Sequence, residues 1–127
     1  MLVIRQEQLD AMRAQRAARF EDRMVTHLRQ VWPERWDALG ETGARALIRA
    51  GIERARGYGM TAEHDVARYI DLMCAVRDDF DTDPRIPPWV AQLLTAPGLS
   101  GARKMDALWE RAKRELRRMA ALSGARG

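Results

Sequence analysis

The sequence is poor in the side chains that most often carry chemistry. Among its 127 residues there is one cysteine, Cys74, and there are two histidines, His27 and His64. A single cysteine excludes a disulfide within the chain and points to a reducing compartment. Cys74 follows Met73 in an apolar stripe, so we expect a buried small residue and not a reactive thiol.

Long hydrophobic runs are also missing. No apolar stretch approaches the roughly 20 residues that a bilayer-spanning helix needs. The chain starts with four apolar residues and then Arg5, whereas a signal peptide carries a hydrophobic region of about 7–15 residues. An amphipathic helix lying on a membrane is disfavoured too, because the core needs its apolar side. We therefore expect a cytoplasmic protein that does not bind membranes.

Strand patterns, internal repeats and low-complexity linkers are absent from the sequence as well. Hydrophobic residues make up 46% and charged residues 31%, which is typical of a globular protein with a highly charged surface. The length suits one compact domain. We therefore predict a single domain over residues 1–127, frayed at residues 1–4 and 123–127.

What the sequence does contain is apolar residues at helical spacing. They recur in five segments, which Pro and Gly residues separate, at about residues 5–31, 43–57, 62–79, 88–95 and 101–122. Between the first two segments, residues 32–40 are expected to be a connection with at most one helical turn. The predicted fold is all-α, a compact bundle of about five helices with short loops.

Single residues inside these segments sharpen the prediction. Thr42, Thr61 and Ser100 each precede a segment and suit an N-cap. Gly51 predicts close approach by another helix, because an interior glycine otherwise costs about 1 kcal/mol relative to alanine. The inner face of the last segment is expected to consist of Met105, Leu108, Trp109, Ala112, Leu116 and Met119.

An acidic stretch, DDFDTD, is the sharpest local feature. Asp79, Asp81 and Asp83 have the alternate spacing of the first three ligands in a calcium-binding loop. The sixth loop position, however, is Pro84 where glycine is needed, and the twelfth is Val90 where glutamate is needed. These departures count against calcium. The alternatives are a solvated turn and an acidic patch that meets arginines of this chain or of a partner.

No arrangement of residues in the sequence predicts catalysis. His64 lies between Glu63 and Asp65, whose side chains point in different directions on a helix. Ser100 and Ser123 fall at cap or tail positions without a nucleophile motif, and no glycine-rich phosphate loop occurs. We expect no enzymatic activity, no cofactor and no metal. An enzyme, such as a toxin with a site around His64, stays a minor hypothesis.

Charge is unevenly distributed along the chain. The net charge of +4 is the balance of +3 over residues 1–60, −4 over residues 61–98 and +5 over residues 99–127. An acidic middle followed by a basic end can steer binding partners, although it does not identify them.

The basic end also raises the alternative of a small nucleic-acid-binding protein. Its cations would be those between Arg111 and Arg118. Glu110 and Glu115 are interspersed among them, and no aromatic platform accompanies them. The sequence therefore favours a basic, solvated helix face and disfavours nucleic acid.

The tryptophans suggest where a protein partner would bind. Trp32 and Trp36 flank Pro33 at a helix junction, and exposed tryptophan is typical of protein interfaces. Trp89 and Trp109 fall on helix faces, where packing in the core is the favoured interpretation. Combining this with the acidic stretch, we expect partner contacts at Trp32, Trp36, Asp79, Asp81, Asp83 and Trp89.

Several stretches together resemble one protein family. They are FEDRMVTHL at residues 20–28, RAGIERARGYG at 49–59, EHDVARYIDLM at 63–73, Asp79-Phe80-Asp81 and Pro88-Trp89. Over about residues 16–110 the chain resembles short helical bacterial proteins encoded in type VI secretion gene clusters, beside spike, adaptor and cargo genes.

The resemblance implies a non-enzymatic accessory protein, and it supplies no catalytic residue. Such a protein would be an adaptor or co-chaperone that helps load a toxin or other cargo onto the secretion spike. An immunity protein that neutralises a toxin is the alternative within the same gene neighbourhood. The expected partner is a protein, either the cargo or an adaptor, and a homodimer stays open.

Overall fold

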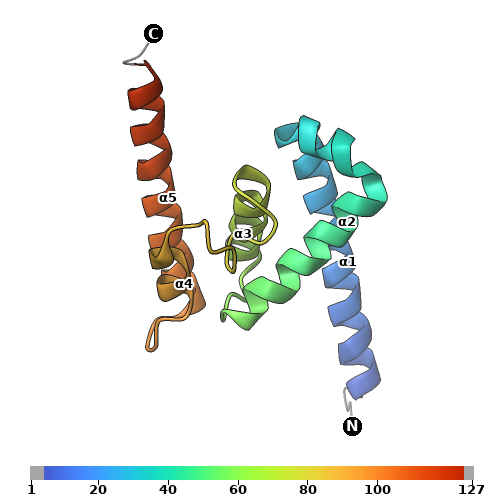
Figure 1. The fold of residues 1–127 in the computed structure, drawn as a ribbon. Helices are drawn as coiled ribbons and strands as arrows, with labels where there is room; N and C mark the ends of the chain where they lie inside the picture. The colour runs from blue at the N-terminus through green and yellow to red at the C-terminus, as the bar shows by residue number, and fades with distance from the viewer. Residues whose placement is uncertain (1–4, 125–127) are drawn as a thin grey trace. The chain divides into compact units, whose positions relative to one another are not determined.

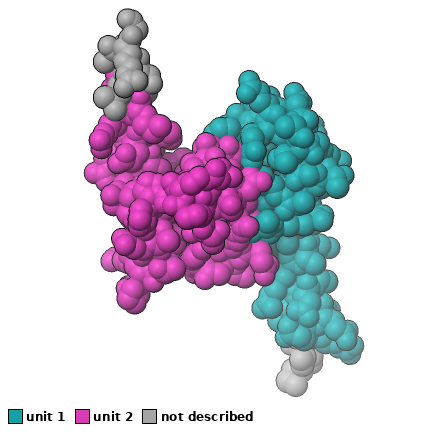
Figure 2. All heavy atoms as spheres, in the orientation of Figure 1, with its two compact units in different colours: residues 1–50 teal, residues 51–127 magenta. Residues whose placement is uncertain are grey.

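A computed structural model describes residues 5–124, and these residues form helices and turns without a strand. The predicted all-α fold with five helices is thus confirmed for the described residues (Figure 1). The chain divides into two compact units, residues 1–50 and residues 51–127 (Figure 2). A single domain over the whole chain stays a prediction. Fraying is expected at residues 1–4 and 123–127. Residues 1–4 and 125–127 lie outside the described residues, whereas residues 123 and 124 are helical.

The first helix, α1 (Gln6–Val31), has no Gly or Pro inside it, as predicted. It ends just before Trp32, whose backbone N–H donates a hydrogen bond of 2.8 Å to the Leu28 carbonyl. The buried stripe of α1 begins only at Phe20 and consists of Phe20, Met24, Val25 and Leu28. Met12 and Val31, which lie at helical spacing with these residues, are exposed.

The second helix, α2 (Pro33–Gly57), begins earlier than predicted and is interrupted at Gly40. Pro33 suits a helix start because its missing N–H would have no partner there. Gly40 has φ +70°, a conformation that glycine adopts without steric cost. The expected connection over residues 32–40 is therefore mostly helical, and Thr42 lies within the helix and not at an N-cap.

Within residues 1–50, a glutamate on α1 is clamped by two arginines of α2. Glu21 Oε2 lies 2.6 Å from Arg45 Nη1, and its Oε1 lies 2.6 Å from Arg49 Nε. These hydrogen bonds, that of Arg49 above all, hold the pKa of Glu21 below its usual range. The glutamate thus joins the two helices in its ionised form.

Residues 51–127 contain the end of α2 and the helices α3 (Glu63–Ala75), α4 (Pro88–Leu94) and α5 (Gly101–Gly124). Helix α5 packs against both α3 and α4 (Figure 1). The large side chains with the least exposure in this unit are Met60, Tyr69, Ile70, Met73, Leu94, Met105 and Leu108. None of the helices between residues 5 and 124 combines the length and apolar character that crossing a bilayer takes.

Glycines allow two close approaches in this unit. A Cβ added at Gly51 would lie 2.6 Å from Ile70 Cγ1, so the predicted approach of another helix is confirmed, and that helix is α3. A Cβ at Gly101 would lie only 2.1 Å from the carbonyl oxygen of Gly59. The start of α5 therefore rests directly on the turn that follows α2, a contact that the sequence analysis did not predict.

The helix ends agree with the capping predictions in one case of three. Ser100 Oγ accepts a hydrogen bond of 3.2 Å from the backbone N–H of Arg103, as an N-cap should. The N-cap of α3 is Ala62 and not Thr61. Helix α3 also stops at Ala75, four residues before the predicted end, because the chain turns there into the acidic stretch. Helix α5 runs two residues further than predicted.

Candidate functional site

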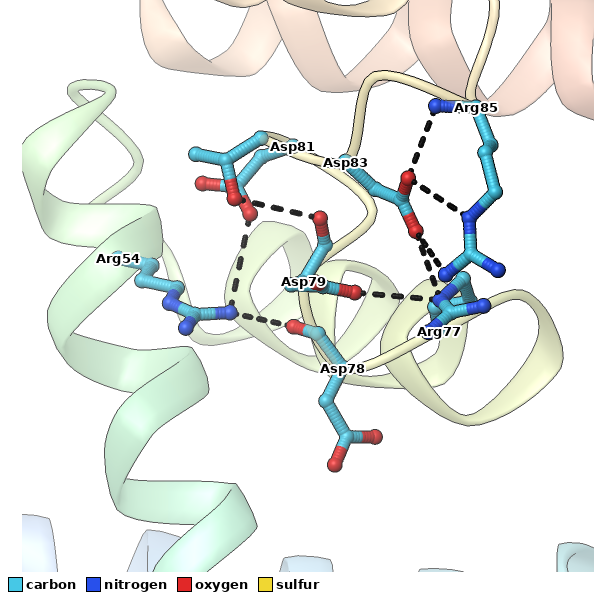
Figure 3. A network of polar contacts seen from close by, with 8 residues as sticks. Arg54, Arg77, Asp78, Asp79, Asp81, Asp83 and Arg85 are labelled. Atoms are coloured by element: carbon cyan, nitrogen blue, oxygen red, sulfur yellow. Dashed lines mark hydrogen bonds and ion pairs between the residues drawn. The ribbon is translucent and has the colours of Figure 1, made fainter.

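The acidic stretch between α3 and α4 is folded around two of its own aspartates (Figure 3). Asp83 Oδ1 accepts hydrogen bonds from the backbone N–H of Arg85 at 2.8 Å and from its Nε at 3.2 Å. Asp83 Oδ2 lies 2.9 Å from Arg77 Nε. The hydrogen bonds from Arg85 hold the pKa of Asp83 below its usual range. Asp83 therefore closes the loop from both sides as a buried anion.

The second aspartate ties the loop to the end of α2. The Tyr58 hydroxyl donates a hydrogen bond of 2.7 Å to Asp81 Oδ2, and Arg54 Nη1 lies 3.7 Å from Asp81 Oδ1. Arg54 also donates a hydrogen bond to the backbone carbonyl of Asp78 (Figure 3). Burial, together with the bond to Asp81, raises the pKa of Tyr58 to about 12.

Three aromatic rings pack together where the acidic stretch meets the end of α2. The ring of Tyr69 on α3 lies between those of Phe80 and Tyr58, with centroids 4.9 Å and 6.1 Å away. Phe80 comes from the acidic stretch itself and is buried. Phe80 and the following Asp81 are thus both buried at this junction.

These contacts decide between the interpretations of the acidic stretch. Its aspartates meet arginines of the same chain, including Asp79, whose Oδ1 lies 3.3 Å from Arg77 Nε. Across residues 5–124, no group of three or more His, Cys, Asp or Glu side chains is placed to hold a metal ion. Asp81 and Asp83 are buried, which corrects the expectation that they offer their carboxylates to a partner. Asp79 is half-buried.

The four tryptophans are all half-buried. Arginines cover three of them: Arg29 lies 4.7 Å from the ring centroid of Trp36, Arg111 lies 4.1 Å from that of Trp89, and Arg68 lies 5.9 Å from that of Trp109. The expected core position of Trp89 and Trp109 is therefore only partly right. A partner contact at Trp32, Trp36 or Trp89 stays a prediction.

The two histidines and the cysteine lie on different helices or differ in burial. His64 is exposed on the first turn of α3, and His27 is half-buried on α1. Asp65, beside His64 in sequence, is buried and pairs at 2.6 Å with Arg68, which also pairs at 2.8 Å with Asp106 of α5. Arg68 thus joins α3 to α5, and Asp65 pairs with it from within α3. Cys74 is buried, as predicted.

An exposed apolar surface that helical periodicity alone does not indicate lies on α5. Met105 and Leu108 are buried, whereas Leu116 and Met119 on the same helical stripe are 54% and 62% exposed. Their expected place on an inner face is wrong, because the C-terminal half of α5 extends beyond α3 and α4 (Figure 1). The sequence does contain a signal for this exposure, because the apolar stripe on α5 is much longer than α4, the helix that covers part of it.

Two cations border this exposed stripe. Lys113 and Arg117 line an open hollow together with Leu116. Lys113 Nζ lies 3.0 Å from Glu110 Oε1, and both side chains are exposed. We call the surface formed by Lys113, Leu116, Arg117 and Met119 the α5 face.

No family model matches this chain, and comparison with curated proteins and with solved structures gives no match either. The resemblance to proteins of type VI secretion clusters therefore stays a prediction.

Proposed function

We propose that this chain is a non-enzymatic, protein-binding accessory protein that uses the α5 face as its contact surface. One observation carries the proposal. The apolar stripe that α5 buries at Met105 and Leu108 continues into solvent at Leu116 and Met119. Large apolar side chains on adjacent turns of one helix face are typical of a surface that packs against another protein.

The polar clusters of the chain support a structural role for its charged groups. Glu21, Asp65, Asp81 and Asp83 are each paired with an arginine. The pair of Glu21 joins α1 to α2, that of Asp65 lies within α3, and those of Asp81 and Asp83 fix the loop before α4. Arginines lower the pKa of Glu21 and of Asp83, so these two acids stabilise the fold in their ionised form. These paired acids thus have structural roles, each within its own unit of the chain.

The more specific role that we propose is that of an adaptor or co-chaperone for a type VI secretion cargo or toxin. Its support is the resemblance of the stretches at residues 49–59 and 63–73 to proteins of those gene clusters. The protein that binds the α5 face would then be the cargo or an adaptor of the spike.

Co-purification tests the proposal. The tagged full chain is compared with Leu116→Ser/Met119→Ser in the native lysate, and retained proteins are identified by mass spectrometry. The matched control is Met12→Ser/Val31→Ser, which changes two apolar residues with similar exposure on α1. We expect the wild-type chain and the control to retain the same protein and the α5 variant to lose it. Recovery of no specific protein by the wild-type chain would contradict protein binding.

A further inference from the structure

We infer that the segment seated on the α5 face is an acidic amphipathic helix of another protein. This inference rests on the proposed function and adds the chemistry of the partner. It is carried by the charges that border the exposed stripe and by the helical spacing of the stripe itself.

The segment of α5 that carries the exposed stripe has a positive net charge. Residues 110–119 contain five basic and two acidic residues, a net charge of +3. On the edge formed by Lys113 and Arg117, both cations line the hollow beside Leu116. Glu115, on the other edge, is half-buried. A partner with apolar side chains at its centre and carboxylates on one flank complements this surface.

The ion pair already present on this edge does not block a partner. The side chains of Lys113 and Glu110 are 47% and 61% exposed, and exposed pairs of this kind contribute little to stability. Arg117 Nε donates a long hydrogen bond of 3.4 Å to the Lys113 carbonyl, which leaves the guanidinium at the surface. A carboxylate of the partner can therefore pair with Lys113 and Arg117 with little loss of stability in this chain.

The spacing of the stripe favours a helical partner. Leu116 and Met119 are three residues apart, which places them about 4.5 Å apart along the helix axis. Side chains of a second helix, recurring every three or four residues, fit between such ridges.

Charge argues against a second copy of this chain as the occupant. In a two-fold dimer the same surface meets itself, so the Lys113 and Arg117 edge would lie against another positively charged α5 face. Nucleic acid would neutralise these cations but would leave Leu116 and Met119 uncovered. A bilayer would take up the two apolar side chains, yet it would also draw the neighbouring Glu115 toward anionic headgroups.

Binding is measured by isothermal titration of the full chain with defined probes. The first is a peptide of about 18 residues, or five helical turns, with leucines every three or four positions and flanking glutamates. The second replaces each glutamate with lysine. Phosphatidylglycerol vesicles and a short DNA duplex are the other probes. We expect the acidic peptide alone to bind, and more weakly as salt is added.

Charge-reversed variants locate the site. Lys113→Glu/Arg117→Glu should weaken binding of the acidic peptide by about tenfold or more, because like charges then face each other. The same variant should gain affinity for the lysine peptide. The matched control is Arg114→Glu, which is on the opposite side of α5 from Leu116 and should bind the acidic peptide within about twofold of wild type. Circular dichroism verifies that each variant stays helical.

Several outcomes would overturn the inference. They are equal binding of the two peptides, binding of vesicles or DNA without the acidic peptide, no binding of any probe, and self-association of the chain through Leu116. If the acidic peptide fails while the lysate partner still requires Leu116 and Met119, protein binding stands and the acidic partner is wrong. If the lysate partner is also missing, the proposed function fails as well.

Discussion

The hydroxyl of Tyr58 donates a hydrogen bond of 2.7 Å to Asp81, and this bond joins the end of α2 to the loop after α3. Asp81 is buried, so the carboxylate depends on protein groups in place of water. A tyrosine and an aspartate therefore connect the end of α2 to the loop that leads into α4, the helix that packs against α5.

Removing the hydroxyl should destabilise residues 51–127. We expect Tyr58→Phe to lower the free energy of unfolding by about 1–3 kcal/mol, because the buried carboxylate loses a donor. Urea unfolding would be followed by the fluorescence of Trp89 and Trp109 in a chain whose Trp32 and Trp36 are replaced by phenylalanine. In the Asp81→Asn background the same change should cost less, and equal costs in the two backgrounds would show that the bond contributes nothing.

The same contact should be visible in an alkaline titration. The pKa of Tyr58 is raised to about 12 by burial and by Asp81, whereas a free tyrosine titrates near 10. Since the folded state keeps its proton longer, the contribution of Tyr58 to stability is complete below pH of about 10 and is lost as pH rises toward 12. Near-ultraviolet absorbance of the Tyr69→Phe chain isolates Tyr58. Asp81→Asn should move its pKa part of the way back, and no movement would assign the whole shift to burial.

Gly51 provides a test of helix packing. Alanine is the better helix former by about 1 kcal/mol, but its Cβ would lie 2.6 Å from Ile70 Cγ1 and 3.0 Å from Met73 Sδ. Overpacking of this kind costs about 1–3 kcal/mol, so we expect Gly51→Ala to be destabilising in urea unfolding. Gly57→Ala is the matched control, since apart from its chain neighbours and the backbone of its own helix no atom lies within 4 Å of its added Cβ. Equal stability of both variants would contradict the close approach of α3.

The features predicted correctly from the sequence depend on local chemistry. Gly51 stands out because glycine is costly inside a helix, and the Ser100 cap depends on a hydrogen bond to a neighbouring N–H. The burial of Asp81 could not be predicted, because its partners, Arg54 and Tyr58, come from α2 and from the turn that follows it. Sequence order does not show which side chains the fold brings together.

Leu116 illustrates a different limit of the sequence. Helical periodicity correctly places it on the same stripe as Leu108. Whether a stripe is covered, however, depends on how far the neighbouring elements extend along it, and that is a property of the folded chain. The candidate surface on α5 therefore emerged only from the structure.

Asp83 should make stability depend on pH in the acid range. Its pKa is lowered in the folded state, so its contribution is complete above the usual aspartate pKa of about 3.9 and is lost as pH falls through the folded value. Asp83→Asn should thus lower the urea midpoint at neutral pH and have little effect once the wild-type carboxylate is protonated. Glu110→Gln is the control, because the pKa of Glu110 is also lowered, by Lys113, but its ion pair is exposed. If Asp83→Asn lowered the urea midpoint equally at neutral pH and at a pH where Asp83 is protonated, a stabilising role of the ionised Asp83 carboxylate would be contradicted.

The contrast between Leu108 and Leu116 tests whether the stripe on α5 really leaves the core. Leu108 is 2% exposed and Leu116 is 54% exposed on the same helix. Leu108→Ala should lower the free energy of unfolding by about 2–5 kcal/mol, because it leaves a cavity. Leu116→Ala should change it by less than about 0.5 kcal/mol, because more than half of that residue is already exposed in the folded chain. Urea unfolding of both variants in the same two-tryptophan chain makes the comparison direct. A large loss for Leu116→Ala would mean that this chain itself covers the stripe, and the surface would then be unavailable to a partner.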